Sequence, residues 1–310
     1  MDKMMRRCPV CLKEAAPRQT GRFGEYTLWM CNACGVEYAE PFAAPGAGWY
    51  ESSDAYGVGR VIARRPEWYH VKALIDIASR GALLDIGCGT GVFLDSAAKA
   101  GFEPWGIDFD GKNIEAARSR YGLDRVYCLS VADIKERFGS NKFNVVTFFE
   151  VLEHLDSPTR FLEDLKGLLS PGGLIVLSVP NRDRFIDTLG TGDGPPNHLT
   201  RWSPSVLKGF LERAGFEVVR LREKTLDSDD LANYLRNRVR LGIASGLVKK
   251  GLAGVGGAAQ ASLDKAVRLM TIKETMLKAV CAVPGFFLSL LQLPGTGMVA
   301  TARIKDKGSI

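Results

Sequence analysis

The segment LLDIGCGTG, residues 83–91, most constrains the fold of this 310-residue chain. It has the pattern of a buried strand that ends in a glycine loop and leads into a helix beginning near Val92. Because Gly87, Gly89 and Gly91 lack Cβ atoms, a ligand can approach the loop backbone closely, and the amide donors of the helix N-terminus face the same place. The segment therefore predicts a cofactor pocket of nucleotide type in an α/β sheet, with a tight turn that binds no ligand as the alternative.

The chain after this loop alternates short apolar runs with amphipathic helices, as a doubly wound parallel sheet requires. Further strands are predicted over residues 104–108, 126–131, 143–149, 174–179 and 216–221, with a last one over 297–305. A helix is predicted ahead of the loop over residues 66–80, with an apolar face formed by Val71, Leu74, Ile75 and Ala78. Composition agrees, because 46% hydrophobic and 25% charged residues are ordinary for a globular protein with a sizeable core.

Two C-x2-C pairs, Cys8 with Cys11 and Cys31 with Cys34, stand 19 residues apart near the start of the chain. Each pair supplies two thiolates from one tight turn, and four thiolates suit a tetrahedral Zn²⁺. We therefore predict a zinc ribbon over residues 1–41, with a structural or substrate-covering role. Seven basic and seven acidic side chains in the first 60 residues leave the ribbon without a basic face for nucleic acid.

The glycine loop reads G-x-G-x-G, which departs from the dinucleotide fingerprint G-x-G-x-x-G/A. It resembles motif I of the class I S-adenosylmethionine-dependent methyltransferases, and the resemblance covers about residues 60–225 and the last strand. The resemblance implies a Rossmann-like sheet of seven strands, the last of them antiparallel. The chain is accordingly divided into the zinc ribbon (1–41), a connector (42–65), a methyltransferase core (66–225 with 294–307) and a basic, apolar helical insertion (226–293).

The resemblance also implies a binding site for S-adenosylmethionine. Asp85 and the glycine loop would hold the methionine end, and Asp108, 23 positions further along, would accept the ribose hydroxyls. A helix cap is the alternative role for Asp108. Phe109 would lie beside the adenine, and Asp133 against the adenine amino group. The full predicted set is Asp85, Gly87, Cys88, Gly89, Gly91, Asp108, Phe109, Asp133 and Phe149.

Three polar residues are candidates for the chemistry. Glu150 and His154 follow the predicted fourth strand, at the carboxyl end where such sheets place their active groups. His198 lies in a glycine- and proline-rich loop over residues 189–202, and it matches a histidine that many relatives carry ahead of the segment ERAGF, residues 212–216. A neutral imidazole can remove a hydroxyl proton, so His198 is the predicted general base, with His154 and Glu150 as competitors. The alternative for His198 is a packing role that holds the loop, and the alternative for Glu153 and His154 is the capping of a helix turn.

The C-terminal part of the chain is strongly basic. From Arg236 to Ile310 it contains 12 basic and three acidic residues, a net charge of +9. Residues 276–293 are apolar but too short for a transmembrane helix, and Lys278 and Pro284-Gly285 interrupt them. Basic charge beside an apolar helical hairpin predicts a peripheral membrane contact through residues 236–293, or a lid over a lipid-linked substrate. A helical cap packed on the core and a dimer face are the alternatives.

Together these patterns predict an S-adenosylmethionine-dependent methyltransferase that acts on a hydroxyl of a sugar, a glycolipid or another small hydroxylated metabolite. An RNA methyltransferase, a sugar C-methyltransferase and a non-catalytic binding protein are the alternatives. The charge-balanced ribbon and the apolar insertion make nucleic acid the less favoured partner. The polar start of the chain and the scattered Cys88, Cys128 and Cys281 predict a reducing, cytoplasmic location, which includes the inner face of the membrane.

Overall fold

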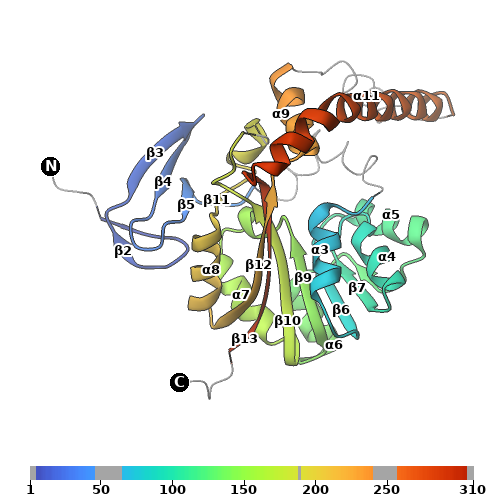
Figure 1. Ribbon diagram of the computed structural model, residues 1–310. Coiled ribbons are helices and arrows are strands. Elements are labelled where there is room, and N and C mark those ends of the chain that lie inside the picture. Colours follow the sequence, from blue (N-terminus) through green and yellow to red (C-terminus); the bar gives the residue numbers. More distant parts are fainter. Residues whose placement is uncertain (1–4, 46–64, 188–189, 240–256, 306–310) are drawn as a thin grey trace.

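Figure 1 shows the computed structural model, which describes residues 5–45, 65–187, 190–239 and 257–305. The core is a seven-stranded sheet in the order β12-β13-β10-β9-β6-β7-β8. Its strands are β6 (Ala82–Ile86), β7 (Glu103–Ile107), β8 (Val126–Tyr127), β9 (Phe143–Phe149), β10 (Leu169–Pro180), β12 (Phe216–Thr225) and β13 (Pro294–Ile304). The pairs from β10 to β8 are parallel, whereas β13 runs antiparallel to both β10 and β12. The predicted doubly wound sheet with an antiparallel last strand is thereby confirmed.

The central strands are almost continuously apolar because both faces of the sheet are covered. Leu84 and Val146 pack in one core cluster, whereas their neighbours Leu83 and Val145 pack in a second. Successive side chains of a strand point to opposite faces, so one residue of each neighbouring pair packs in the core on one side of the sheet and the other packs in the core on the opposite side. Such a strand has no hydrophobic alternation, which is why the sequence shows plain apolar runs here.

Helices on both faces complete the two cores. One face is covered by α3 (Trp68–Asp76), α4 (Val92–Lys99) and α5 (Gly111–Tyr121), the other by α6 (Val131–Phe138), α7 (Pro158–Lys166) and α8 (Pro204–Arg213). The third strand is shorter than predicted. It ends at Tyr127, and a capping box between Ser130 and Asp133 starts α6 at Val131, inside the range predicted as strand.

The apolar face predicted for the helix over residues 66–80 is wrong at Val71, Ile75 and Ala78, which are exposed, whereas Leu74 packs against the core. The helix is α3, and its Val71 and Ile75 are 47% and 64% exposed. The buried residues are Ala73 on the helix and Ile77 just beyond its end. The face is chosen by a ring contact, since Tyr69 stacks on Phe149 of β9 with 5.5 Å between ring centroids. Tyr69, Ala73 and Ile77 are spaced by four residues and therefore share that face.

The N-terminal ribbon is a small β module whose sheet includes a strand of the core. A hairpin joins β1 (Arg6–Arg7) to β2 (Glu14–Ala15), and a second sheet has the order β11-β5-β4-β3. That sheet contains β3 (Arg18–Phe23), β4 (Tyr26–Met30), β5 (Glu37–Glu40) and β11 (Thr200–Arg201). Because β11 begins two residues after His198, the ribbon holds one end of the predicted catalytic loop. Residues 46–64 of the predicted connector lie outside the described residues.

The insertion before the last strand is helical. It consists of α9 (Ser228–Val239) and α11 (Gly257–Leu290), and residues 240–256 between them lie outside the described residues. The expectation that Pro284-Gly285 interrupts the apolar segment is wrong, because α11 continues through Pro284. A Cβ atom on Gly285 would collide with the backbone of Ser228, so the two helices meet closely at this point.

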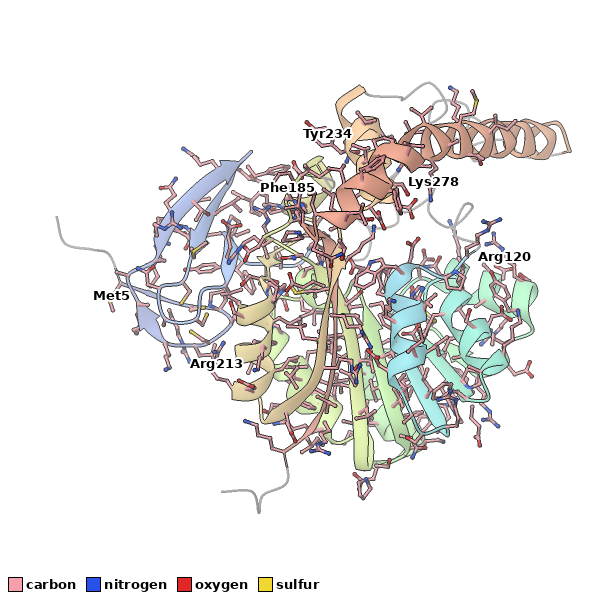
Figure 2. The ribbon with its side chains drawn as sticks, viewed as in Figure 1. Met5, Arg120, Phe185, Arg213, Tyr234 and Lys278 are labelled. Atoms are coloured by element: carbon pink, nitrogen blue, oxygen red, sulfur yellow. The ribbon has the colours of Figure 1, made fainter. Side chains whose placement is uncertain are left out.

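Figure 1 shows α11 extending beyond the sheet, and Figure 2 shows Lys278 on it and Tyr234 on α9 near their junction. Lys278 forms an ion pair of 2.9 Å with Asp229 of α9. No helix in the described part of the chain has the length and apolar composition needed to cross a bilayer.

Candidate functional site

The glycine loop joins β6 to α4 with three left-handed residues. The φ angles of Gly87, Gly89 and Gly91 are 74°, 52° and 82°, a region that favours glycine. A Cβ atom on Gly91 would lie 2.7 Å from Leu123 Cδ1, which shows that packing as well as backbone conformation requires this glycine. A Cβ atom on Gly89 would meet no described atom within 4 Å. The middle of the loop therefore borders open space, as a cofactor-binding loop must.

Two buried carboxylates flank this loop. Asp108, after β7, accepts hydrogen bonds from Gly89 N at 2.9 Å and from Asp110 N at 2.8 Å. The N-cap of α5 is Asp110, whose side chain accepts a hydrogen bond from Lys112 N. The helix-cap role considered for Asp108 is therefore filled by Asp110. Burial raises the pKa of Asp108. Burial also raises the pKa of Asp85 to about 8, although Thr147 Oγ1 donates a hydrogen bond of 2.7 Å to it.

The other predicted cofactor residues occupy different environments. Cys88 is buried against β7, where a Cβ atom on Gly106 would lie 2.8 Å from its Sγ. Phe149 is buried at the end of β9, whereas Phe109 is 52% exposed. Asp133 is exposed, and its carboxylate accepts a hydrogen bond from Ser130 N at 2.9 Å at the start of α6. The structure thus brings Asp85, Cys88 and Asp108 to the loop and engages Asp133 in a helix cap.

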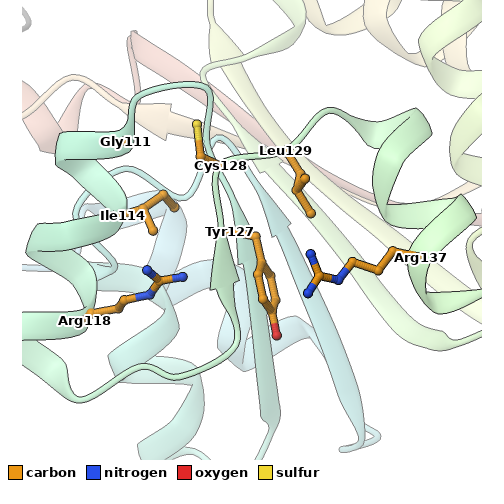
Figure 3. A pocket seen from close by; sticks show the side chains of 7 residues that line it. All are labelled: Gly111, Ile114, Arg118, Tyr127, Cys128, Leu129 and Arg137. Carbon is orange, nitrogen blue, oxygen red and sulfur yellow. The ribbon is translucent and has the colours of Figure 1, made fainter.

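A shallow cavity of about 260 Å³ opens beside β8. Figure 3 shows Tyr127 in this cavity between Arg118 and Arg137. Its lining is Gly111, Ile114, Arg118, Tyr127, Cys128, Leu129 and Arg137. None of the predicted cofactor or catalytic residues lines it, so we do not assign it to the site.

Glu150 follows directly after β9 and begins the predicted catalytic segment. Its φ of 52° is unusual for a residue with a side chain and is held by hydrogen bonds to β10. Glu150 N donates to Ser178 O at 3.1 Å, and Ser178 Oγ donates to Glu150 Oε1 at 2.7 Å. This segment touches the glycine loop, since a Cβ atom on Gly87 would lie 2.8 Å from Val151 Cγ2.

The single turn over Leu152–His154 then places Glu153 between two histidines. Glu153 Oε1 lies 3.9 Å from His154 Nε2 and 4.0 Å from His198 Nε2. The rings of His154 and His198 pack edge to face, with 4.8 Å between centroids. Burial raises the pKa of Glu153 well above its usual range and lowers the pKa of His154 to about 3. Sequence reasoning brings His154 and His198 forward but gives Glu153 only a capping role.

His198 is positioned by a network of charges. Its Nδ1 lies 3.2 Å from Asp193 Oδ1, and Asp193 Oδ2 accepts from Arg184 at 2.6 Å and pairs with Arg201 at 2.7 Å. Burial alone would raise the pKa of Asp193, but the hydrogen bond from His198 and the two arginines lower it below its usual range. Arg201 also pairs with Glu37 of the ribbon at 2.8 Å. The predicted loop contains Asp193 and Arg201, but nothing in its sequence shows this pairing.

The backbone of the same loop is held from both sides. Leu199 N donates to Glu153 O at 2.8 Å, and Ala39 N of the ribbon donates to Leu199 O at 2.9 Å. His198 therefore sits between the Glu153 turn and the edge of the ribbon sheet.

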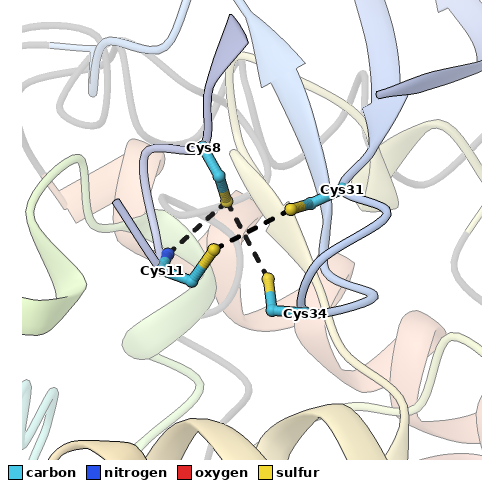
Figure 4. Close-up of side chains that lie close together, drawn as sticks. All are labelled: Cys8, Cys11, Cys31 and Cys34. Carbon is cyan, nitrogen blue, oxygen red and sulfur yellow. Dashed lines mark hydrogen bonds between the residues drawn. The ribbon is translucent and has the colours of Figure 1, made fainter. Parts of the chain in front are cut away.

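The four paired cysteines converge in the ribbon (Figure 4). The Sγ atoms of Cys8 and Cys34 are 3.9 Å apart, and those of Cys11 and Cys31 are 3.8 Å apart. Four thiolates at about 2.3 Å from a tetrahedral ion lie about 3.8 Å from one another, so the cluster has the dimensions of a zinc site. A hydrogen bond from Cys34 lowers the pKa of the Cys8 thiol to about 5, so one thiolate is already favoured.

Comparison with known proteins adds a family to this geometry. Residues 62–221 match the family described as methyltransferase domain. A ubiquinone biosynthesis O-methyltransferase of Caulobacter sp. is 34% identical over 125 residues, which are 39% of this chain and 49% of that protein. One of Xanthomonas oryzae pv. oryzae is 32% identical over 185 residues, which are 56% of this chain and 74% of that protein. The chain spans about half the length of several curated relatives that it matches.

A solved structure supports the same fold. It is an S-adenosylmethionine-dependent methyltransferase from Thiobacillus denitrificans, in complex with S-adenosyl-L-homocysteine. The similarity covers 85% of this chain and 100% of that one, with a TM-score of 0.51 and 15% sequence identity.

Proposed function

Because the chain belongs to the methyltransferase domain family, we propose that it transfers a methyl group from S-adenosylmethionine to a hydroxyl of a small acceptor. The observation that carries this proposal is the contact between the two halves of the site. The glycine loop meets the segment after β9 at Gly87 and Val151, and that segment brings Glu150 and His154 together with His198. The names of the relatives support oxygen as the acceptor atom.

The cofactor residues proposed are those of the sequence prediction. Asp85, Cys88 and the three loop glycines would hold the methionine end, and Asp108 the ribose. Phe109, Asp133 and Phe149 would border the adenine. The left-handed glycines and the buried acids beside them fit such a cofactor, because the backbone at Gly89 is open to a ligand.

When bound, S-adenosylmethionine supplies an electrophilic methyl group on a sulfonium. This chain would hold the acceptor oxygen in line with that group and accept its proton. His154 is a poor proton acceptor, since burial lowers its pKa to about 3. Asp193 fixes the ring orientation of His198. A sugar, a glycolipid and another hydroxylated metabolite are all acceptors of the class that we propose.

We also propose that Cys8, Cys11, Cys31 and Cys34 bind one Zn²⁺. Their spacing matches a tetrahedral four-thiolate site. Four thiolates leave no open position for a substrate, so the ion would be structural. It would hold the ribbon whose edge strand β5 pairs with β11 of the core.

For the insertion we propose peripheral contact with an anionic membrane, at its inner, cytoplasmic face. Seven large apolar side chains of α11 and the turn after it are exposed by 61–71%: Met276, Val280, Val283, Phe286, Phe287, Leu290 and Leu291. This exposure argues against a cap packed on the core, within the described residues. The net charge of +9 from residue 236 onward suits an anionic surface.

Methyl transfer to fractionated extract tests the function. Radiolabelled S-adenosylmethionine should label a small-molecule or lipid fraction. RNase-sensitive label would establish RNA methylation instead, and product analysis that finds a new carbon–methyl bond would establish C-methylation. If the protein binds S-adenosylhomocysteine but methylates no fraction, it is a binding protein and not an enzyme.

The matched variants for this experiment are Asp108→Ala and Asp124→Ala. Loss of charged hydrogen bonds from Asp108 is worth roughly 1.5–3 kcal/mol, which weakens S-adenosylhomocysteine about 10- to 100-fold in calorimetry. Asp124 is exposed, and its replacement should leave the affinity unchanged. Equal affinity in both variants would contradict the ribose role of Asp108.

A further inference from the structure

We infer that Glu153, His154 and His198 bind a divalent metal cation beside the site of methyl transfer. Their candidate ligand atoms, one from each residue, all lie within 4.8 Å of one another. The role that we give to this cation rests on the proposed O-methylation, but its binding can be tested separately. The site is distinct from the four-cysteine cluster, which belongs to the ribbon.

The Glu153 carboxylate is the strongest indication. It is fully buried, and among the described residues neither of its oxygens has a hydrogen-bond partner. A buried carboxylate without partners costs several kcal/mol if it is ionised, and native proteins rarely leave one so. A cation placed between Glu153 and the two imidazoles would compensate this charge at both oxygens.

Both histidines are oriented as metal ligands usually are. His154 Nδ1 lies 2.6 Å from Asn197 O, and His198 Nδ1 lies 3.2 Å from Asp193 Oδ1. At His198, a proton on Nδ1 satisfies Asp193 and leaves the ligand lone pair on Nε2. His154 also has a backbone hydrogen bond at Glu150, beside the one at Asn197. Both Nε2 atoms are the ones that lie about 4 Å from Glu153 Oε1. Asp193 is itself fixed by Arg184 and Arg201, so the outer contacts are rigid as well.

The donor set indicates the class of cation. Two imidazole nitrogens and one carboxylate suit Zn²⁺, Mn²⁺, Fe²⁺ or Co²⁺ better than Ca²⁺, which prefers oxygen ligands alone. Three protein ligands leave coordination positions open, unlike the closed set of four thiolates. An acceptor hydroxyl could occupy such a position, and a bound cation lowers the pKa of an oxygen ligand. Glu150, at the end of β9, then remains to receive the hydroxyl proton as the methyl carbon leaves sulfur for oxygen.

Mn²⁺ binding tests this inference without reference to activity. The protein loaded with one equivalent of Zn²⁺, which the four thiolates take in preference to the site at Glu153, is titrated with Mn²⁺. Free Mn²⁺ is followed by electron paramagnetic resonance, and Mn²⁺ competes poorly for the thiolates. We expect one Mn²⁺ per chain and at least a tenfold loss of affinity in Glu153→Gln and in His198→Gln. Glu163→Gln, at an exposed residue of α7, should bind as the wild type does.

Circular dichroism and S-adenosylhomocysteine binding on the same samples show whether each variant is folded. The inference is overturned if the wild type binds no Mn²⁺, or if a folded Glu153→Gln binds it equally well. If the protein transfers methyl groups but binds no Mn²⁺, the proposed function stands and the cation site is rejected. If the protein binds Mn²⁺ but methylates no fraction, the cation site stands and the proposed function is rejected.

Discussion

Single residues in this site are held in states that they would not adopt in water. Asp85 is the clearest case, because it is fully enclosed at the end of β6 and hydrogen-bonded to Thr147, yet burial raises its pKa to about 8. Desolvation is the larger effect here, since one neutral hydroxyl cannot replace the water that an ionised carboxylate loses. The residue therefore links stability to pH in the cofactor-free protein.

Replacement of Asp85 tests this link. The folded pKa lies above the unfolded value, so the folded state binds the proton more tightly, and stability falls as pH rises from about 4 to about 8. Urea unfolding should show wild-type stability falling by a few kcal/mol over this range relative to Asp85→Asn. Glu115→Gln, at an exposed residue of α5, should keep the wild-type profile. Parallel profiles for wild type and Asp85→Asn would contradict the raised pKa.

At the scale of elements, α11 is the least integrated part of the described chain. It meets α9 at Gly285 and Ser228, but its apolar side chains from Met276 to Leu290 remain largely exposed. Exposed apolar surface of this extent normally marks a binding face. The net charge of +9 over residues 236–310 is what favours an anionic membrane.

The membrane proposal predicts a specific loss. The double variant Phe286→Ser, Phe287→Ser should co-sediment several-fold less with vesicles of anionic lipid than the wild type does. Added salt should weaken wild-type binding, because the electrostatic part is screened. Val219→Ser removes a comparably exposed apolar residue from β12 and should have no effect. Wild-type protein that stays in the supernatant at low salt would rule the contact out.

At the scale of the whole molecule, the ribbon and the core share one sheet through β5 and β11. Ala39, Leu199 and Glu153 form a continuous series of backbone hydrogen bonds from the ribbon to the turn over Leu152–His154, and Arg201 adds a charge pair to Glu37. The four-cysteine cluster thus supports the position of His198 from outside the core. Unfolding of the ribbon should therefore loosen the loop that contains His198.

Removal of one cysteine of the proposed zinc site checks this coupling. Cys34→Ser should lower the zinc content and speed hydrogen exchange at the amides of Ala39 and Leu199, with slower methyl transfer as a consequence. Cys128→Ser changes an exposed cysteine outside the cluster and should leave all three measurements unchanged. Unchanged exchange at Leu199 in a zinc-free Cys34→Ser protein would show that the loop holds its position alone.

Features whose partners are close in sequence could be predicted from the chain itself. The three glycines of the loop indicate a backbone conformation that other residues rarely adopt. The spacing of three positions within each C-x2-C pair indicates that both thiolates can reach one metal ion. The parallel sheet follows similarly from apolar runs that alternate with amphipathic helices.

Only the tertiary structure decided which distant side chains meet. The contact of Tyr69 with Phe149 sets which face of α3 is buried, and this face differs from the predicted one. The helix α11 continues through Pro284 and packs closely on α9. The tertiary structure also placed Glu153 and His198, which are far apart in the chain, within 4.0 Å, with Asp193 behind the imidazole. Such contacts depend on the packing of a whole sheet edge, and no local periodicity or spacing encodes them. The sequence by itself therefore determined the fold class, the glycine loop and the cysteine cluster, whereas packing determined how Glu153, His154 and His198 are arranged.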